Sequence, residues 1–177
     1  QSTDGKQIIS IGWLIDPSLN RDSNPHLFVG YWVNGSLACY NGCGYVQTSK
    51  KLSPGTELPV TDVPQTFVIM HEDGKWWLKY QSKWIGYFPD SLWSSQGVTF
   101  NKANKVAWFG EVSQGRNEMG NGLFGTRSDS ALVQDMLVMT SHSTWIVATA
   151  SPAVKDPNCY NVGNFSGASF HYGGPGC

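Results

Sequence analysis

Two strand-like runs joined by a tight turn constrain the fold of this chain more than any other stretch. TFVIMH and KWWLKY, which cover residues 66–71 and 75–80, are rich in β-branched and aromatic residues. Between them lie Glu72, Asp73 and Gly74. Asp-Gly is a preferred hairpin turn because both residues tolerate a positive φ angle. The stretch therefore predicts an antiparallel β-hairpin.

Similar runs recur along the whole chain and predict further strands. They are QIISIGWLI (7–15), HLFVGYWV (26–33), KWIGYF (83–88), VAWFGEV (106–112), ALVQDMLVMT (131–140), STWIVATA (143–150) and one last aromatic strand in the tail. The runs 131–140 and 143–150 are expected to form a hairpin through Ser141 and His142. PDSLW, residues 89–93, suggests one short helical turn. We expect an all-β chain: a single domain over residues 1–177, built as an antiparallel β-sandwich of two packed sheets with little or no helix.

The composition disfavours several classes of partner. Charged residues make up 14% of the chain, the formal net charge is -1, and no basic cluster is longer than Lys50 and Lys51. Nucleic acids and anionic membranes are therefore not expected as partners. No window approaches 18 uninterrupted apolar residues, and the N-terminal QSTDGKQ does not resemble an export signal. We expect a monomer from which any export signal has already been removed.

The four cysteines indicate disulfides and an oxidising, extracellular location. Three pairings are possible. We favour Cys39 with Cys43, which closes the CYNGC turn, and Cys159 with Cys177, which ties down the C-terminal tail. A structural zinc site is disfavoured because a second closely spaced pair of Cys or His ligands is missing. No metal and no cofactor is expected.

Glu111 is the residue that most invites a catalytic interpretation. In a strand over residues 106–112 it shares one face with Ala107 and Phe109, and the other face is also largely apolar. We therefore expect Glu111 to project into an aromatic-lined cleft, where desolvation favours the protonated carboxyl and prepares it for proton transfer. The alternatives are a glutamate at a strand end and one held by a structural hydrogen bond.

Seven motifs, in order, resemble the neprosin family. They are GYWVNGSLACYNGCGYVQ, GKWWLKY, KWIGYFPDSLW, VAWFGEV, EMGNGLF, NCYNV and the terminal YGGPGC, and the resemblance runs from about residue 8 to the end. It implies a β-sandwich of two antiparallel sheets, the two disulfides favoured above, and a propeptide that precedes the domain. It also implies a secreted glutamic endopeptidase that works in acid on peptide or protein substrates and cuts on the carboxyl side of proline.

The resemblance implies a catalytic pair of glutamates, and only one of them is present. The glutamate of the family's Trp-(Gly or Phe)-Gly-Glu-Val strand falls on Glu111. The other is expected two residues before a Gly-Trp pair, and here Gly12 and Trp13 follow Ser10 instead. A serine hydroxyl can donate a hydrogen bond to an oxyanion but cannot act as the general base. Glu111 would then be the sole base, with Ser10 as its altered partner.

Ser10, Gly12 and Leu14 share one face of the first strand, and small residues there allow close approach of a substrate backbone. The alternative is that Ser10 and Gly12 only make room for bulky neighbours. Ser10 as the nucleophile of a serine hydrolase is disfavoured, because no G-x-S-x-G elbow surrounds it.

The tryptophans are predicted to divide between a core and a binding surface. We expect Trp32, Trp77 and Trp108 in the core. The residues expected to bind substrate by stacking on a proline ring or a sugar are Trp13, Trp76, Trp84 and Tyr87. Gly12 is expected to bind substrate through close approach of the backbone.

Two functions of different classes remain open. The first is a glutamic endopeptidase, weakened or intact, with Glu111 as base. The second is a catalytically inactive β-sandwich that binds a peptide or polysaccharide through an aromatic groove. A native glutamate replaced by Ser10 in this chain is a third possibility.

Overall fold

The computed structural model describes residues 1–113, 117–140 and 144–177. Its elements are almost all antiparallel β-strands, with two short helices, as the sequence predicts. By its contacts the chain forms two compact units, Gln1–Lys105 and Val106–Cys177, which are described separately below. Within the described residues, no helix has the length and apolar character needed to cross a bilayer.

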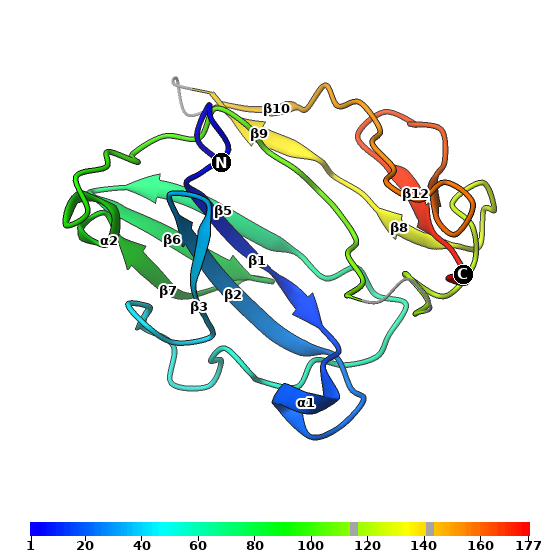
Figure 1. Ribbon diagram of the computed structural model, residues 1–177, viewed down its shortest axis with the longest axis horizontal. Helices are drawn as coiled ribbons and strands as arrows, with labels where there is room; N and C mark the ends of the chain where they lie inside the picture. The colour runs from blue at the N-terminus through cyan, green and yellow to red at the C-terminus, as the bar shows by residue number, and fades with distance from the viewer. Residues whose placement is uncertain (114–116, 141–143) are drawn as a thin grey trace. The chain divides into compact units, whose positions relative to one another are not determined.

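The first sheet of the N-terminal unit has three strands in the order β1-β2-β3. They are β1 (Ile8–Leu14), β2 (His26–Val33) and β3 (Ser36–Tyr40), coloured blue to light blue in Figure 1. The loop from β1 to β2 contains a short helix, α1 (Pro17–Asn20), that was not predicted. It forms because the carboxylate of Asp16 accepts hydrogen bonds from the N–H groups of Ser18 and Leu19.

The second sheet of this unit has four strands in the order β4-β7-β6-β5. They are β4 (Val46–Gln47), β5 (Phe67–Glu72), β6 (Lys75–Tyr80) and β7 (Lys83–Pro89), and helix α2 (Ser91–Ser94) follows β7. The predicted hairpin is confirmed, and Asp73 and Gly74 have φ angles of 50° and 71°. The short helical turn after Pro89 is confirmed as well.

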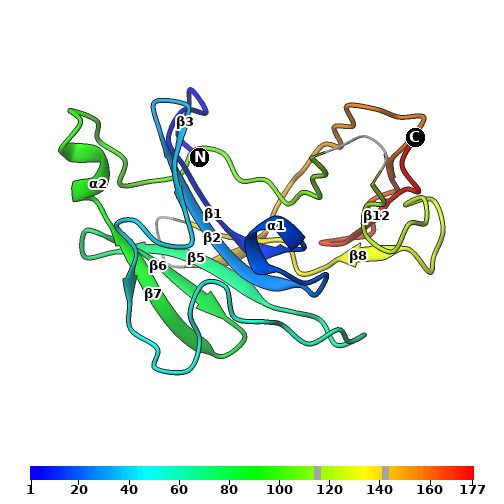
Figure 2. The same ribbon diagram turned by 60° about the horizontal axis from the view of Figure 1, so that its bottom comes forward.

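The two sheets of the N-terminal unit enclose one hydrophobic core and so form a β-sandwich (Figures 1 and 2). Alternate residues of each strand point inward, and Tyr31 from the first sheet contacts Phe88 from the second at 5.1 Å between ring centroids. Trp93 closes one end, fully buried, with its Nε1–H donating to the carbonyl of Trp32 at 3.0 Å. The main core residues are Ile9, Leu27, Val29, Tyr31, Val33, Trp76, Leu78, Tyr80, Ile85, Phe88, Trp93 and Phe100.

The C-terminal unit contains shorter strands. A three-stranded sheet has the order β11-β12-β8, from β11 (Asn161–Val162), β12 (Phe170–Gly173) and β8 (Ala131–Val133), and β12 and β8 carry labels in Figure 1. A separate ribbon pairs β9 (Leu137–Met139) with β10 (Trp145–Val147).

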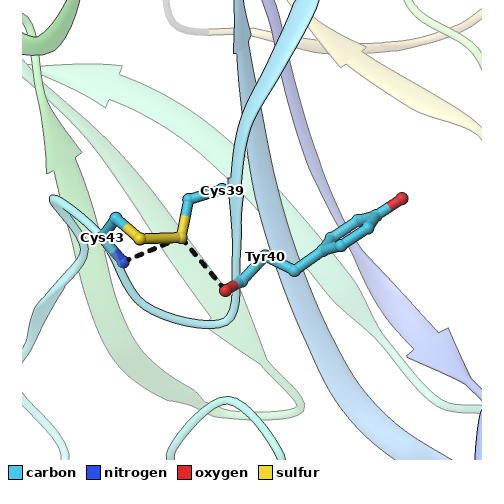
Figure 3. Close-up of a disulfide and its surroundings, with 3 residues drawn as sticks. All are labelled: Cys39, Tyr40 and Cys43. Carbon is cyan, nitrogen blue, oxygen red and sulfur yellow. Dashed lines mark hydrogen bonds between the residues drawn. A yellow bond between two sulfur atoms is a disulfide. The ribbon is translucent and has the colours of Figure 1, made fainter. Parts of the chain in front are cut away.

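Both favoured disulfides are present, Cys39–Cys43 in the first unit and Cys159–Cys177 in the second. The first closes the turn that follows β3, where the N–H of Cys43 donates to the Sγ of Cys39 at 3.2 Å. Figure 3 shows the ring of Tyr40 extending away from this disulfide, as alternation along a strand requires. The disulfide therefore anchors the chain directly beside Tyr40.

The strands between residues 131 and 147 differ in part from the prediction. Residues 131–140 do not form one strand: β8 pairs with β12 and β9 pairs with β10, and Asp135 between them has a φ angle of 55°. The pairing of 137–139 with 145–147 confirms the predicted hairpin, while its turn at Ser141 and His142 lies outside the described residues.

The predicted strand over residues 106–112 is wrong, because this segment has no regular secondary structure. Its path is set by close packing at Gly110, where a Cβ atom would lie 2.7 Å from the ring of Tyr172 and 2.8 Å from the Sδ of Met119. The segment is therefore held by side-chain contacts within its unit, and not by a hydrogen-bonded strand ladder.

Candidate functional site

Ser10 lies in the middle of β1, on the face that points away from the core. Its neighbours Ile9 and Ile11 pack toward the core, so alternation turns Ser10 and Gly12 to the outer face. The antiparallel register places Ser10 opposite Gly30 and Gly12 opposite Phe28 on β2. Ser10 is only 8% exposed despite its outward direction. A small polar side chain is thus held in a protected position on the outside of the three-stranded sheet.

Three aromatic rings surround this position because Gly30 has no side chain. A Cβ at Gly30 would lie 3.2 to 3.3 Å from the rings of Phe28, Trp32 and Tyr40. The rings contact one another edge to face, with centroids 5.3 Å apart for Phe28 and Tyr40 and 6.2 Å apart for Trp32 and Tyr40. We call the set Ser10, Gly12, Phe28, Gly30, Trp32 and Tyr40 the Ser10 surface.

The sequence prediction missed most of the walls of the Ser10 surface. It assigned Trp32 to the core, whereas the side chain lies half-buried on the outer face. The alternation within HLFVGYWV does place Phe28, Gly30 and Trp32 on one face. What the sequence lacks is the register that sets Gly30 opposite Ser10, and the neighbouring strand that brings Tyr40 to the same place.

Of the residues predicted to bind substrate, Gly12 alone shares the outer face of β1 with Ser10. Trp13 pairs with Leu27 on the opposite, core-side face, and its exposure of 42% reflects its position near the strand end. Trp76 points into the core, is 5% exposed, and donates from Nε1 to the carbonyl of Phe100 at 2.9 Å. Its predicted stacking role is wrong, because the ring has no free face for a ligand.

Trp84 and Tyr87 lie on the other sheet, on the outer face of β7. Their register partners on β6 are Lys79 and Trp77, so Trp77 shares this outer face and is not the core residue that was predicted. The assignments of Trp76 and Trp77 are therefore interchanged relative to the sequence prediction. Alternation gives the signal that the prediction missed, because Trp76 shares a face with Leu78 and Tyr80 while Trp77 shares the other with two lysines, Lys75 and Lys79.

Glu111 belongs to the C-terminal unit and is exposed. The expected burial of its side chain in an aromatic-lined cleft is not found. Trp108 is half-buried and Phe109 is exposed. The residue just before Glu111 packs on Tyr172, and burial raises the pKa of that phenol. Glu111 is thus an accessible carboxylate next to a tightly packed glycine.

The chemistry available on the Ser10 surface itself is hydrogen-bond donation and apolar contact. Its members carry two hydroxyl groups and no carboxylate or imidazole. The nearest histidine in the paired strand, His26, lies opposite Leu14 and is occupied: Nδ1 contacts the carbonyl of Gly55 and Nε2 contacts Asp22, each at 2.9 Å. A serine nucleophile activated by an adjacent histidine therefore has no support on this surface.

No metal centre is found among the described residues, where no group of three or more His, Cys, Asp or Glu side chains converges. In a comparison with protein families, the neprosin family model matches residues 1–175 of the 177-residue chain. The match spans both compact units and includes both Ser10 and Glu111.

Proposed function

The chain belongs to the neprosin family, and from this premise we propose that it is a secreted glutamic endopeptidase that hydrolyses peptide bonds after proline in acid. The observation that carries the proposal is the WFGEV sequence at residues 108–112, in which Glu111 resembles a glutamate of the family's motif, within a match that covers nearly the whole chain. Two disulfides support an oxidising, extracellular location. The proposed substrate is a peptide or protein, and the proposed enzyme is a monomer.

In the proposed reaction Glu111 is the general base. Its carboxylate takes a proton from water as the water oxygen attacks the carbonyl carbon of the proline residue, and a tetrahedral oxyanion forms. The C–N bond then breaks, and the proton passes from Glu111 to the leaving amine. An exposed carboxylate is suited to this exchange only if a bound substrate excludes bulk water from it.

Ser10 is the proposed partner, with its hydroxyl donating a hydrogen bond to the oxyanion. Its protected position supports this role, because a donor removed from bulk water stabilises developing charge more strongly. A glutamate at position 10 could also take up and release a proton during the reaction, whereas serine can only offer its hydroxyl as a hydrogen-bond donor. Loss of one oxyanion donor typically costs about 10²- to 10³-fold in rate, which sets the scale of weakening expected if Ser10 donates poorly.

The rest of the Ser10 surface supports substrate positioning. Gly12 leaves room for a peptide backbone, because no atom of the surrounding residues lies within 4 Å of a Cβ built there. The rings of Phe28, Trp32 and Tyr40 offer apolar faces and edges to a proline ring.

The second candidate is an inactive β-sandwich that binds a peptide or polysaccharide. Ser10 in place of glutamate favours this candidate, because the Ser10 surface then keeps its aromatic walls without a carboxylate. The two candidates differ in one measurable property, which is hydrolysis that depends on Glu111.

The test is cleavage of a proline-containing fluorogenic peptide between pH 2 and 7 by the chain, Ser10→Glu and Glu111→Gln. We expect measurable activity that Glu111→Gln abolishes and Ser10→Glu raises by about 10²- to 10³-fold, the size of one restored oxyanion donor. If Ser10→Glu cleaves the peptide and the unaltered chain does not, the fold is that of a peptidase, and the serine at position 10 is what inactivates it. If neither the chain nor Ser10→Glu cleaves the peptide, and circular dichroism shows that both are folded, the result would overturn the peptidase proposal and favour the binding module.

A further inference from the structure

The outer face of the four-stranded sheet carries a second aromatic surface, separate from the Ser10 surface. Trp77 on β6 is the register partner of Tyr87 on β7, and the two ring centroids are 4.8 Å apart. Trp84 lies further along β7, with its ring 6.2 Å from that of Trp77. Trp84 is 39% exposed, and Trp77 and Tyr87 are half-buried. We call these three rings with Met70 the Trp77 face.

The rings of the Trp77 face are tilted and do not form a flat platform. The interplanar angles are 54° for Trp77 with Tyr87 and 71° for Trp77 with Trp84. Tilted neighbours leave wedge-shaped notches between them. A notch accepts a small compact ring edge-on, whereas the broad face of a sugar stacks best on a single exposed ring.

Two lysines hold the rings in this arrangement. The Nζ of Lys75 lies 5.8 Å from the ring centroid of Trp77 and 5.3 Å from that of Tyr87, and the Nζ of Lys79 lies 5.6 Å from that of Trp84. Contacts of this kind contribute about 0.5–1 kcal/mol at exposed sites. The notches are therefore largely formed before any ligand binds, which lowers the entropic cost of binding.

A hollow of about 270 Å³ opens at the turn end of the Trp77 face. Met70, Trp77 and Trp84 supply its apolar lining, and Glu72, Asp73 and Lys75 supply its charges. None of the ion pairs found in the described residues includes Glu72 or Asp73. Lys75 is directed to the aromatic rings, so the rim of the hollow offers two unpaired carboxylates.

We propose that the Trp77 face is a docking site for a proline-rich, extended segment of a protein substrate that carries a Lys or Arg beside the prolines. A polyproline II segment has three residues per turn, no internal hydrogen bonds and little conformational freedom to lose, and aromatic-lined grooves bind such segments through the pyrrolidine rings. Here the notches take the prolines and the carboxylates of Glu72 and Asp73 pair with the adjacent cation.

Charge separates this occupant from the alternatives. The hollow is lined by two carboxylates and one ammonium, that of Lys75, so its excess charge is negative and disfavours an acidic polysaccharide or a single-stranded nucleic acid. A neutral polysaccharide leaves those carboxylates without a partner. The proposal rests on the proposed peptidase function for its biological sense, because a site of this kind raises the local concentration of proline-rich substrate for cleavage elsewhere on the enzyme.

The test measures binding in a chain that cannot cleave, so that it does not depend on catalysis. A fluorescein-labelled peptide with repeated prolines and one arginine is titrated with the Glu111→Gln chain and followed by fluorescence anisotropy. Comparison peptides replace the prolines with alanines, or the arginine with glutamine. A neutral and an acidic polysaccharide are offered as competitors.

We expect the proline-and-arginine peptide to bind, Trp84→Ala to weaken binding at least tenfold, and Trp145→Ala to leave it unchanged. Trp145 is the matched control, an exposed strand tryptophan (45% exposed) in the other unit. The double variant Glu72→Gln and Asp73→Asn should weaken only the arginine peptide, and Asp62→Asn is its charge control. Unfolding midpoints check that each variant is folded.

Three binding patterns would overturn the proposal. They are equal binding of the alanine peptide, no effect of Trp84→Ala on a bound proline peptide, and Trp84-dependent binding of a polysaccharide in place of the peptide. Absence of any peptide binding by a folded chain would overturn it too. Each of these concerns the Trp77 face alone, whereas the proposed function stands or falls on cleavage that depends on Glu111.

Discussion

At the scale of single residues, glycines determine the shape of the Ser10 surface. Gly30 and Gly12 lie on the same face of the same sheet, yet their surroundings differ completely. Three rings surround the space that a side chain at Gly30 would enter, and the space at Gly12 is empty to 4 Å. The pair allows a controlled measurement of how tightly the aromatic walls pack.

Gly30→Ala should therefore destabilise the protein by about 1–3 kcal/mol, the usual cost of overpacking. Gly12→Ala should leave the free energy of unfolding unchanged or raise it by about 0.4–1 kcal/mol, because alanine restricts the unfolded chain. Urea denaturation of the two variants measures both values. Equal changes in the free energy of unfolding at the two positions would contradict the prediction, because they would show that the rings around Gly30 move aside without a cost in stability.

His26 and Asp22 form the best-placed titrating pair in the first unit. The hydrogen bond to the Gly55 carbonyl and the contact with Asp22 raise the pKa of His26 from its ordinary value of 6.5. The hydrogen bond from the backbone N–H of Asn24 and the contact with His26 lower the pKa of Asp22 from its ordinary value of 3.8. A raised histidine pKa adds stability below pH 6.5 that is lost as the pH rises through the folded value. A lowered aspartate pKa adds stability above pH 3.8 that is lost in acid.

The stabilisation from this pair should be greatest between about pH 4 and 6.5. We predict that the urea midpoint of the protein falls more steeply between pH 6 and 9 than that of Asp22→Asn, in which His26 has no carboxylate partner. Other groups titrate alike in the two proteins, so their effects on the urea midpoint cancel in the comparison. One of these groups is the N-terminal amine, whose pKa is lowered by burial. Parallel curves for the two proteins would contradict the prediction.

At the scale of elements, β6 shows how alternation divides a run of aromatic residues between core and surface. Trp76, Leu78 and Tyr80 point into the sandwich, and Trp77 points out. The predicted run KWWLKY is therefore a strand with one face buried in the core and one outer face. The same alternation makes β1 present Ser10 outward and Ile9 inward.

Replacement of each adjacent tryptophan should separate the two faces of β6. Trp76→Ala should cost about 3–5 kcal/mol, as for a large core side chain that also loses its hydrogen bond to Phe100. Trp77→Ala should cost clearly less stability and should reduce binding to the Trp77 face instead. Denaturant midpoints and peptide anisotropy on the same two variants check both halves, and a reversed order of stabilities would refute the assignment of faces.

At the scale of the whole molecule, one family match spans two compact units. The expectation of a single domain over residues 1–177 stays a prediction. Each unit has one disulfide, and the two close chain segments of different length, with sequence separations of 4 and 18 residues. The stabilisation from each disulfide can thus be assigned to one unit.

Replacing Cys159 and Cys177 by alanine should cost about 3 kcal/mol, and replacing Cys39 and Cys43 about 2 kcal/mol, because a longer closed loop restricts the unfolded chain more. Hydrogen exchange by mass spectrometry locates each loss. If the sequence folds as one cooperative domain, either replacement lowers protection in residues 1–105 and 106–177 alike. Loss confined to the unit that carries the changed disulfide would show that the two units unfold separately.

The sequence by itself determined the all-β character, the main strands of residues 1–105 and the Asp73-Gly74 hairpin, because these follow from local alternation and turn geometry. It favoured, among three possible pairings, the disulfides that the structure contains. Only the tertiary structure decided that Ser10 faces Gly30 among three aromatic rings, and that residues 106–112 are not a strand. The register of a strand, and the existence of a strand at all, both depend on a hydrogen-bonded neighbour that is distant in sequence. Long-range pairing therefore decides what local alternation leaves open.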